Sequence, residues 1–432
     1  MPSPFIAAWL ALLLAGCGGG GSADRVIGAG DESPLASAPP SEPTPSAPQP
    51  GTAPPAAAPE PADGQEPPGT PVVDAPSSPP AIDPPPTTPG VEDPPPPALD
   101  PAPTVRVAQA DGTSIAGARQ VAADDRAFRT IAAAPRPWSA DASFRMAAGL
   151  PSQSLKVSFV SDAPSIELRL LAWGNTQVEI RVDGVPVTAT ALRLGDDWRP
   201  RVVRLDFPAG ARSRSYELFG RFLPFGGAWV PAGSTLTYPA AEDARPLVAF
   251  APGDSYTQGS GAPSARQTYA GVAADELGVE LWTEGVGGTG WLSGGAHDPG
   301  ARVDGTLALL NKAPAIVVTA LGYNDRFGDL AAVAARYDAT VARIRAAWPQ
   351  ARIVTLGPWT PLGAARETQA MRELLIAGAE RNGVTFIDLE GIVTAANMDT
   401  YTNADRVHPN AEGHRHLGRT IAARLRAAGV TP

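Results

Sequence analysis

The sequence predicts a three-layer α/β domain with a five-stranded parallel sheet, preceded by an all-β sandwich of jelly-roll type and a disordered proline-rich linker. Three observations predict this organisation. Prolines and acidic residues crowd into residues 31–104, short alternating runs of apolar and polar residues fill 105–240, and apolar runs alternate with helical stretches from 246 onward. We therefore expect four segments, at 1–17, 18–104, 105–243 and 244–432.

The first segment contains a short apolar run, Phe5–Ala15, followed by the sequence Leu-Ala-Gly-Cys that ends at Cys17. The run is too short to span a bilayer and is typical of a signal-peptide core. Leu-Ala-Gly-Cys resembles the lipobox of bacterial lipoproteins, which implies lipidation of Cys17 and a membrane anchor at the bacterial cell envelope, periplasmic or at the cell surface. The alternative is an ordinary secretory signal. Cys17 is the single cysteine, so a disulfide within the chain is excluded.

Residues 31–104 hold 27 of the 49 prolines and 11 acidic residues, but no Lys or Arg. Such a stretch has too little apolar surface to offset the entropy of ordering it, so we expect an extended, polyproline-like linker. These residues carry a charge of −11, whereas the whole chain has a formal net charge of −10. The rest of the chain therefore sums to +1 and is nearly neutral. The sequence contains no cluster of Lys and Arg residues that would predict a nucleic-acid partner.

The next segment shows the period-two alternation of half-buried strands and no helix of useful length. Asp183-Gly184 is a hairpin turn signal between two of these runs. We interpret the segment as a jelly-roll-like sandwich. The expected strands are Leu155–Val160, Ile166–Leu171, Val178–Val182, Val185–Val187, Val202–Phe207 and Ser215–Phe219.

In the last segment, buried strands alternate with helices, which implies right-handed crossovers and a parallel sheet. Gly278 is expected to end the first helix and Asn410 to cap the last. The expected strands are Leu247–Ala251, Val279–Thr283, Ala315–Leu321, Ala351–Leu356 and Val384–Leu389. The expected helices are Ala265–Leu277, Leu330–Trp348, Ala364–Arg381 and Ala411–Ala428.

Polar and glycine residues follow these strands at the edge where parallel sheets bind ligands. Ser255 offers a nucleophilic hydroxyl, His408 a base that is neutral near pH 7, and Asp405 a carboxylate that can orient the imidazole. The backbone N–H groups of Ser255 and Gly288 and the amide of Asn324 are candidate donors to an oxyanion. Acyl transfer needs this set of groups, and we expect no metal or other cofactor.

These loops resemble the sequence blocks of the SGNH hydrolase superfamily. The matching blocks are Gly253–Gly259, Gly322–Asp325 with the pattern G-x-N-D, and Asp405–Pro409 with the pattern D-x-x-H-P. The second block is looser, and Gly288 is chosen by its spacing to Thr289. The resemblance implies a flavodoxin-like fold with strand order 2-1-3-4-5. A sandwich before such a domain resembles carbohydrate esterase family 2, which removes acetyl groups from polysaccharides.

Other polar residues are expected to have structural roles. Asp254 should structure the Ser255 loop, and Asp325 should also be structural. His414 and His416 are expected on an exposed helix face, and His297 in a loop.

Aromatic residues could contact a sugar ring, although packing in the core is the alternative for each. Those near the expected active-site rim are Tyr256, Tyr323, Trp291 and Trp359, and those in the sandwich are Trp173, Trp198 and Trp229.

The sequence thus predicts a serine ester hydrolase that removes short acyl groups, chiefly acetyl, from carbohydrate at the cell surface. Its expected partners are an acylated carbohydrate or small ester, and the membrane through the lipid anchor. Three alternatives remain open: an O-acyltransferase acting on surface glycans, a lipase or thioesterase of the same superfamily, and a non-catalytic glycan-binding lipoprotein. The acyl length and the oligomeric state are left open.

Overall fold

The computed structural model describes residues 99, 101–147, 153–174, 176–359 and 366–431. The predicted lipidation site Cys17 and nearly all of the predicted linker lie outside these residues. Among the described residues, no helix has the length and apolar character that a membrane span requires. The sandwich and the α/β layers belong to one compact unit.

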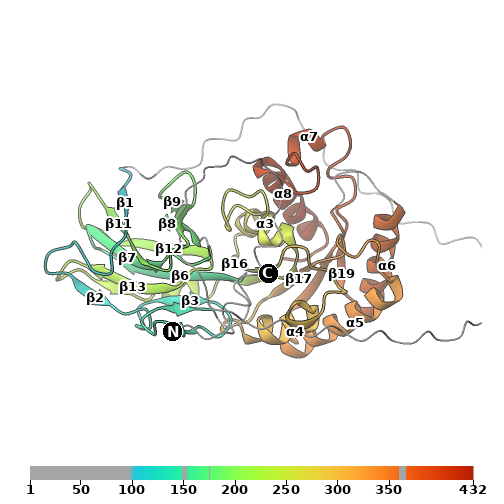
Figure 1. Ribbon diagram of the computed structural model, residues 1–432, viewed down its shortest axis with the longest axis horizontal. Coiled ribbons are helices and arrows are strands. Elements are labelled where there is room, and N and C mark those ends of the chain that lie inside the picture. Colours follow the sequence, from blue (N-terminus) through green and yellow to red (C-terminus); the bar gives the residue numbers. More distant parts are fainter. Residues whose placement is uncertain (1–98, 100, 148–152, 175, 360–365, 432) are drawn as a thin grey trace, which may run out of the picture. The chain divides into compact units, whose positions relative to one another are not determined.

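The sandwich consists of two antiparallel sheets packed over one apolar core (Figure 1). The first contains β1 (Thr104–Ala108), β2 (Arg119–Val121), β4 (Arg136–Pro137), β5 (Arg145–Met146), β7 (Ser165–Leu171), β11 (Pro200–Asp206) and β13 (Phe225–Val230). The second contains β3 (Arg129–Ile131), β6 (Ser154–Ser161), β8 (Thr176–Val182), β9 (Val185–Pro186), β10 (Leu192–Gly195), β12 (Arg214–Arg221) and β14 (Leu236–Thr237).

Strand β13 was not predicted, although it lies inside the first sheet between β7 and β5. Its sequence Phe-Gly-Gly-Ala-Trp-Val is interrupted by Gly226 and Gly227. Glycine weakens a strand signal and marks a close backbone approach. A Cβ atom at Gly227 would lie 2.2 Å from the carbonyl oxygen of Val121 on the neighbouring strand, so the position requires glycine.

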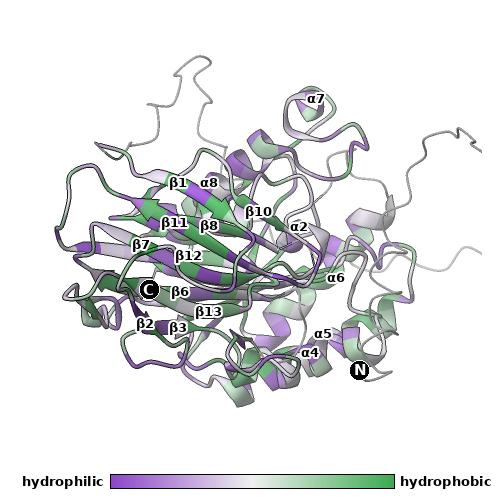
Figure 2. Cartoon of the chain, turned by 60° about the vertical axis from the view of Figure 1, so that its left-hand side comes forward, coloured by the Kyte–Doolittle hydropathy of each residue, from purple (hydrophilic) through white to green (hydrophobic). Residues whose placement is uncertain are grey.

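The third sheet is parallel, with the strand order β16-β15-β17-β18-β19. This is the order 2-1-3-4-5 that was predicted, and the predicted α/β fold is confirmed. The strands are β15 (Leu247–Gly253), β16 (Glu280–Gly285), β17 (Ile316–Ala320), β18 (Arg352–Leu356) and β19 (Thr385–Ile387). Figure 2 shows hydrophobic and hydrophilic segments side by side both along the sandwich strands and on the helices.

Helices cover both faces of this sheet, as the alternating side chains of β15 show (Figure 1). Val248 and Phe250 pack toward α3 (Tyr269–Leu277) and α8 (Ala411–Ala427). Leu247 and Ala249 pack toward the opposite helices. Those helices are α4 (Pro299–Gly305), α5 (Leu330–Ala347) and α6 (Arg366–Asn382). Two short helices, α2 (Ser255–Gln258) and α7 (Met398–Tyr401), lie in loops.

Helix α3 begins four residues later than predicted, because Thr268 caps it. The Thr268 hydroxyl accepts a hydrogen bond from the Gly271 N–H at 3.2 Å. At the other end Gly278 adopts a left-handed conformation with φ of 70°, which is the predicted helix stop. Asn410 caps α8 as predicted, and its side chain accepts from the Gly413 N–H.

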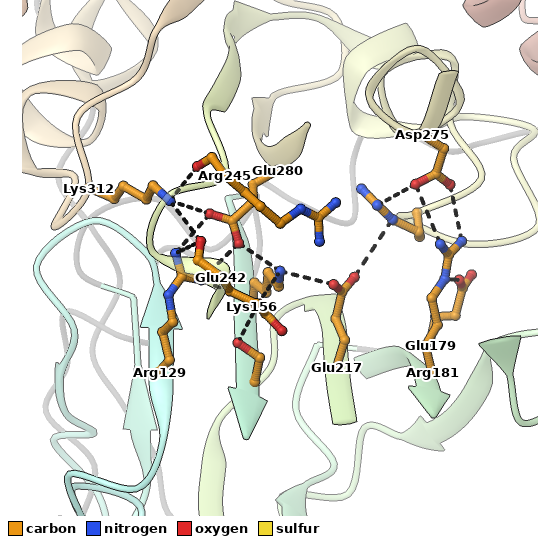
Figure 3. A network of polar contacts seen from close by, with 12 residues as sticks. Arg129, Lys156, Glu179, Arg181, Glu217, Glu242, Arg245, Asp275, Glu280 and Lys312 are labelled. Atoms are coloured by element: carbon orange, nitrogen blue, oxygen red, sulfur yellow. Dashed lines mark hydrogen bonds and ion pairs between the residues drawn. The ribbon is translucent and has the colours of Figure 1, made fainter. Parts of the chain in front are cut away.

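The sandwich and the α/β layers meet across a buried ion-pair network centred on Glu280, the first residue of β16 (Figure 3). Arg129 of β3 and Lys156 of β6 each contact the carboxylate of Glu280 at 2.8 Å, and Lys312 contacts it at 2.5 Å. The Glu280 side chain is fully shielded from solvent. Burial alone would raise the pKa of this carboxyl, but the three cations lower its pKa to about 2. Glu280 therefore links the two parts of the unit as a charged group.

Candidate active site

Ser255 lies beyond the carboxyl end of β15, an inner strand of the parallel sheet, and opens the short helix α2. Asp254 is the N-cap of α2, and its carboxylate accepts a hydrogen bond from the Tyr256 N–H at 3.0 Å. Burial raises the pKa of Asp254 to about 7. The preceding Gly253 is sterically required, since a Cβ atom there would lie 2.2 Å from the Thr257 hydroxyl. The strand-to-helix turn therefore presents Ser255 at the sheet edge, and Asp254 has the predicted structural contact.

The structure brings Ser255, His408 and Asp405 into one hydrogen-bonded chain. His408 Nε2 lies 3.0 Å from Ser255 Oγ, across 153 sequence positions. His408 Nδ1 lies 2.6 Å from Asp405 Oδ2. Nucleophile, base and orienting carboxylate therefore have the geometry that serine acyl transfer requires.

A tight turn holds the Asp405 carboxylate in place. Its Oδ1 accepts from the backbone N–H groups of Val407 and His408, each at 3.0 Å. Arg406, which lies between Asp405 and Val407, adopts a left-handed conformation with φ of 55°. Burial would raise the pKa of Asp405, but the hydrogen bonds from His408 and from the backbone outweigh it, so the pKa lies below its ordinary value. Asp405 is therefore an anion at neutral pH, suited to fix the imidazole tautomer.

The predicted oxyanion donors lie on loops that are joined to one another. Asn324 Nδ2 donates to the carbonyl oxygen of Thr289 at 2.8 Å, which links the loop after β17 to the loop after β16. An amide nitrogen carries two N–H bonds, so one remains for a ligand. Gly288, next to Thr289, is exposed and has a φ of 74°.

The N–H of Gly287, the residue before Gly288 in this loop, is already used. It donates to the Gln258 side chain at 2.6 Å. Within the described ranges, the N–H groups of Ser255 and Gly288 have no hydrogen-bond acceptor. Those two groups therefore remain free to bind an oxyanion.

Comparison with known proteins identifies this part of the chain. Residues 251–416 match the model of the GDSL-like lipase/acylhydrolase family. This part is a domain of the SGNH/GDSL superfamily. The chain is therefore an enzyme of the esterase class, with hydrolysis of an ester or acyl transfer as its reaction. No curated protein sequence matches the chain.

Solved structures resemble the SGNH domain together with the sandwich. A salicylyl-acyltransferase, SsfX3, from a tetracycline biosynthetic pathway is 18% identical and superposes with a TM-score of 0.58, covering 73% of this chain and 99% of that one. A family two carbohydrate esterase from Cellvibrio japonicus is 16% identical, with a TM-score of 0.57 and coverage of 72% and 97%. Another from Clostridium thermocellum, in complex with cellohexaose, is 15% identical, with a TM-score of 0.56 and coverage of 70% and 98%. At these identities the likeness shows the fold.

Behind the site of the SGNH domain lies Arg302, which no sequence pattern predicted as part of the site. It comes from α4, and its side chain is fully buried in an ion pair with Glu284 at 2.8 Å. Arg302 Nη2 also donates to the Gly253 carbonyl at 2.6 Å, and Nη1 donates to the Thr289 hydroxyl at 3.0 Å. One side chain therefore ties the end of β15, the end of β16 and the Gly288 loop together.

Asp325 has a comparable role, as predicted. Its carboxylate accepts from the backbone N–H groups of Trp291 at 2.7 Å and Leu292 at 3.0 Å. A Cβ atom at Gly290 would lie 2.2 Å from this carboxylate, so the close approach requires glycine. Asp325 thereby fixes the residues that follow the Gly288 loop.

The aromatic residues near the site belong mainly to the core of the SGNH domain. Trp291 and Trp359 are buried, which decides both for packing rather than for contact with a sugar. Trp359 Nε1 donates to the Val407 carbonyl at 3.1 Å and so supports the His408 loop. Tyr256 is also buried and packs edge-on against His408, with ring centroids 5.5 Å apart. Tyr323 is half-buried and remains near the rim.

The prediction for His414 was wrong. Its side chain is completely buried between α3 and α8, with Nδ1 accepting from the Tyr269 N–H at 3.1 Å and the Nε2–H donating to the Ser260 carbonyl at 3.0 Å. These two bonds satisfy both ring nitrogens and permit burial. His416, which was also predicted on an exposed face, is instead half-buried and stacks on Tyr401. His297 lies in a short 3-10 turn, as expected for a loop residue.

Proposed function

We propose that the chain is a serine esterase that removes short acyl groups, chiefly acetyl, from carbohydrate at the bacterial cell envelope, where Cys17 anchors it through lipid. One observation carries the catalytic part of the proposal. Ser255 Oγ, His408 Nε2 and Asp405 Oδ2 are connected through distances of 3.0 and 2.6 Å at the edge of the sheet.

In the first half-reaction, Ser255 Oγ attacks the ester carbonyl carbon as His408 Nε2 accepts its proton. The negative charge that develops on the carbonyl oxygen is stabilised by the N–H groups of Ser255 and Gly288 and by the Asn324 amide. Collapse of the tetrahedral intermediate breaks the ester bond. His408 returns the proton to the departing alkoxide, and an acyl-enzyme remains.

In the second half-reaction, water replaces the alcohol. His408 accepts a proton from water as its oxygen attacks the acyl carbon, and the same donors bind the second oxyanion. Ser255 leaves with the proton from His408, and the free acid departs. Asp405 keeps the proton of His408 on Nδ1 in the resting state, so that Nε2 is the basic nitrogen in both steps.

Two features favour carbohydrate as the alcohol part of the substrate. Solved structures with the same two-part architecture include family two carbohydrate esterases, one of them in complex with cellohexaose. Asn324 and Gly288 are exposed, so the site lies open at the surface, where a long polymer has access. A narrow pocket for a long acyl chain would favour a lipase instead.

The test is the release of acetate from acetylated xylan, and of p-nitrophenol from p-nitrophenyl acetate, by the full chain and by Ser255→Ala. We expect a loss of at least about 10³-fold in kcat for the variant on both substrates. Val107→Ala, an exposed change on β1 of the sandwich, is the matched control and should retain full turnover. Undiminished turnover by Ser255→Ala would reject the mechanism.

Acyl transfer is the second candidate, since the salicylyl-acyltransferase shares the architecture. It uses the same first half-reaction, and a sugar hydroxyl takes the place of water in the second. The two reactions separate when acetylated donor and a glycan acceptor are supplied together. Acetylated acceptor that forms faster than free acetate would identify a transferase, and the reverse would identify the esterase.

A further inference from the structure

Three tryptophans gather at one end of the sandwich, and we name Trp138, Trp173 and Trp198 the tryptophan cluster. Their ring centroids lie 5.8 to 6.4 Å apart. Trp198 is 37% exposed, and the other two are half-buried. Trp229, by contrast, is buried in the sandwich. The cluster therefore lies at the surface, where an aromatic group can meet a ligand.

The loops that carry the cluster are held rigidly. Trp198 and Phe222 adopt left-handed conformations with φ of 62° and 49°, which are unfavourable for bulky residues and persist where the surroundings enforce them. The backbone N–H of Trp198 donates to the Ala172 carbonyl at 2.8 Å. The Thr176 hydroxyl donates to the Phe222 carbonyl at 2.6 Å, and the Phe222 ring packs edge-on against Trp173. The rings are thus preorganised, which lowers the cost of binding.

The chemistry of the cluster suits a sugar. A pyranose presents an apolar C–H face, which packs on an aromatic ring, and hydroxyl groups around its rim, which need hydrogen-bond partners. Within the described part of the chain, no acceptor takes a hydrogen bond from the three indole N–H groups. Asp196 and Asp197 are exposed beside Trp198 and can accept from sugar hydroxyls. A lipid acyl chain has no hydrogen-bonding groups that could pair with these polar groups.

The cluster lies at the end of the sandwich that adjoins the catalytic edge. Phe222 follows Arg221, the last residue of β12, which pairs with Ser154 of β6. The residue before Ser154 forms a β-bridge with Glu284, near the end of β16. Arg221 also lies near the loop that follows Ser255, because a Cβ atom placed on Gly259 would lie 3.7 Å from Arg221 Nη2. A single polymer could therefore contact both places.

We propose that the tryptophan cluster is a binding subsite for a polysaccharide chain, which holds the acylated polymer while one of its esters reaches Ser255. This inference rests on the proposed function for its substrate and extends it to a second site. The cluster binds sugar rings irrespective of their acylation. It raises the local concentration of polymer at the active site without taking part in the chemistry.

The experiment measures binding of the full chain, with Ser255→Ala to prevent turnover, in native gels that contain acetylated xylan, deacetylated xylan or glucomannan. At least one polymer should retard this protein. Adding Trp173→Ala and Trp198→Ala should raise the dissociation constant at least about tenfold. Adding Val107→Ala instead, an exposed apolar side chain on β1 of the same sandwich, should change it less than twofold.

A kinetic measurement separates the subsite from the triad. With Ser255 intact, the double tryptophan variant should keep kcat/KM for p-nitrophenyl acetate within twofold, while kcat/KM for acetylated xylan falls about tenfold. An inactive triad would abolish both activities and leave binding in the gels intact, so failure of the proposed function is distinguishable from failure of this inference.

Three results would overturn the inference. The first is that no polymer retards the Ser255→Ala protein. The second is that the tryptophan changes leave retardation intact. The third is that the changes abolish binding to phosphatidylcholine vesicles rather than to polymer, which would make the cluster a lipid contact. Should the double variant fail to fold, as judged by circular dichroism, Trp198→Ala alone is measured against the same criterion.

Discussion

Arg302 and Glu284 form an ion pair at 2.8 Å in which both side chains are completely shielded from solvent. The pair lies directly beneath the candidate active site, since Arg302 also contacts the Gly253 carbonyl and the Thr289 hydroxyl. A buried pair adds little stability over a well-packed apolar pair, but loss of one partner leaves an uncompensated charge. This arrangement makes Arg302 a positioning residue for the nucleophile turn and the Gly288 loop.

Arg302→Met should therefore reduce both stability and activity. We expect a loss of about 3–5 kcal/mol in the free energy of unfolding, measured in urea, because Glu284 is left unpaired. Combining it with Glu284→Leu should recover much of that stability. The double variant should still show a kcat for p-nitrophenyl acetate about 100-fold below the parent, because the loops shift while the chemistry is unchanged.

The matched control is Arg343→Met, which removes an exposed ion pair with Asp304 on the neighbouring helix surface. It should change stability by less than about 1 kcal/mol and leave kcat unaffected. A stable double variant with full kcat would show that Arg302 does not position the site.

The network around Glu280 gives a second prediction (Figure 3). The folded-state pKa of this carboxyl is about 2, below its ordinary value of 4.5. The carboxylate thus contributes stability above pH 4.5, and that contribution is lost as the pH falls toward 2. Glu280→Gln should cost about 3 kcal/mol at pH 7 by thermal unfolding, and the difference from the parent should shrink as the pH falls below 4.5.

Glu412→Gln is the control for this change, since Glu412 pairs with Arg415 on an exposed helix surface. Its effect should stay under about 0.5 kcal/mol at any pH between 4 and 8. Equal destabilisation by the two variants would mean that the contact between sandwich and SGNH domain does not depend on Glu280.

The residues that meet at the sheet edge were predictable because apolar periodicity places their loops and because these loops resemble the sequence blocks of the SGNH superfamily. Ser255 and Asn324 lie in loops that follow the parallel strands β15 and β17, and His408 lies shortly before α8. Parallel strands place the loops at their carboxyl ends along a common edge. Apolar periodicity likewise predicted a strand at Leu247–Ala251, and the observed strand β15, whose two faces pack against separate helix layers, extends it to Gly253.

What escaped prediction depends on contacts that no local pattern records. Arg302 is one of two charged residues in the seven-residue helix α4, and only the tertiary arrangement shows that it pairs with Glu284. His414 is polar and was placed on the exposed helix face, yet bonds to Tyr269 and Ser260 make its burial possible. Trp138 was not singled out, because its neighbours Trp173 and Trp198 are distant in sequence.

Asn324 supplies a prediction about the transition state. Its amide donates one N–H to Thr289 and has a second for the oxyanion. Asn324→Ala should lower kcat for p-nitrophenyl acetate about 100-fold with little change in KM, because the charge develops after substrate binding. Asn311→Ala, whose amide donates to the Thr130 carbonyl on the protein surface, should leave both constants unchanged. An effect on KM alone would assign Asn324 to substrate binding instead.

The buried His414 predicts a loss of stability in mild acid. Burial lowers the pKa of this imidazole to about 4, below its ordinary value of 6.5. As the pH falls from 6.5 to 4, the unfolded chain gains a proton at this position and the folded chain does not, so the unfolded state is favoured. The cost is about 2 kcal/mol near pH 4.5. In urea unfolding at pH 7, His414→Gln should be less stable than the parent, because glutamine cannot reproduce both hydrogen bonds. At pH 4.5 the difference in free energy of unfolding between the two proteins should be smaller by about 2 kcal/mol, because only the parent loses stability through His414. Other acid-sensitive groups affect both proteins equally. If the difference in free energy of unfolding between parent and variant is the same at both pH values, His414 takes up its proton in the folded state as readily as in the unfolded one.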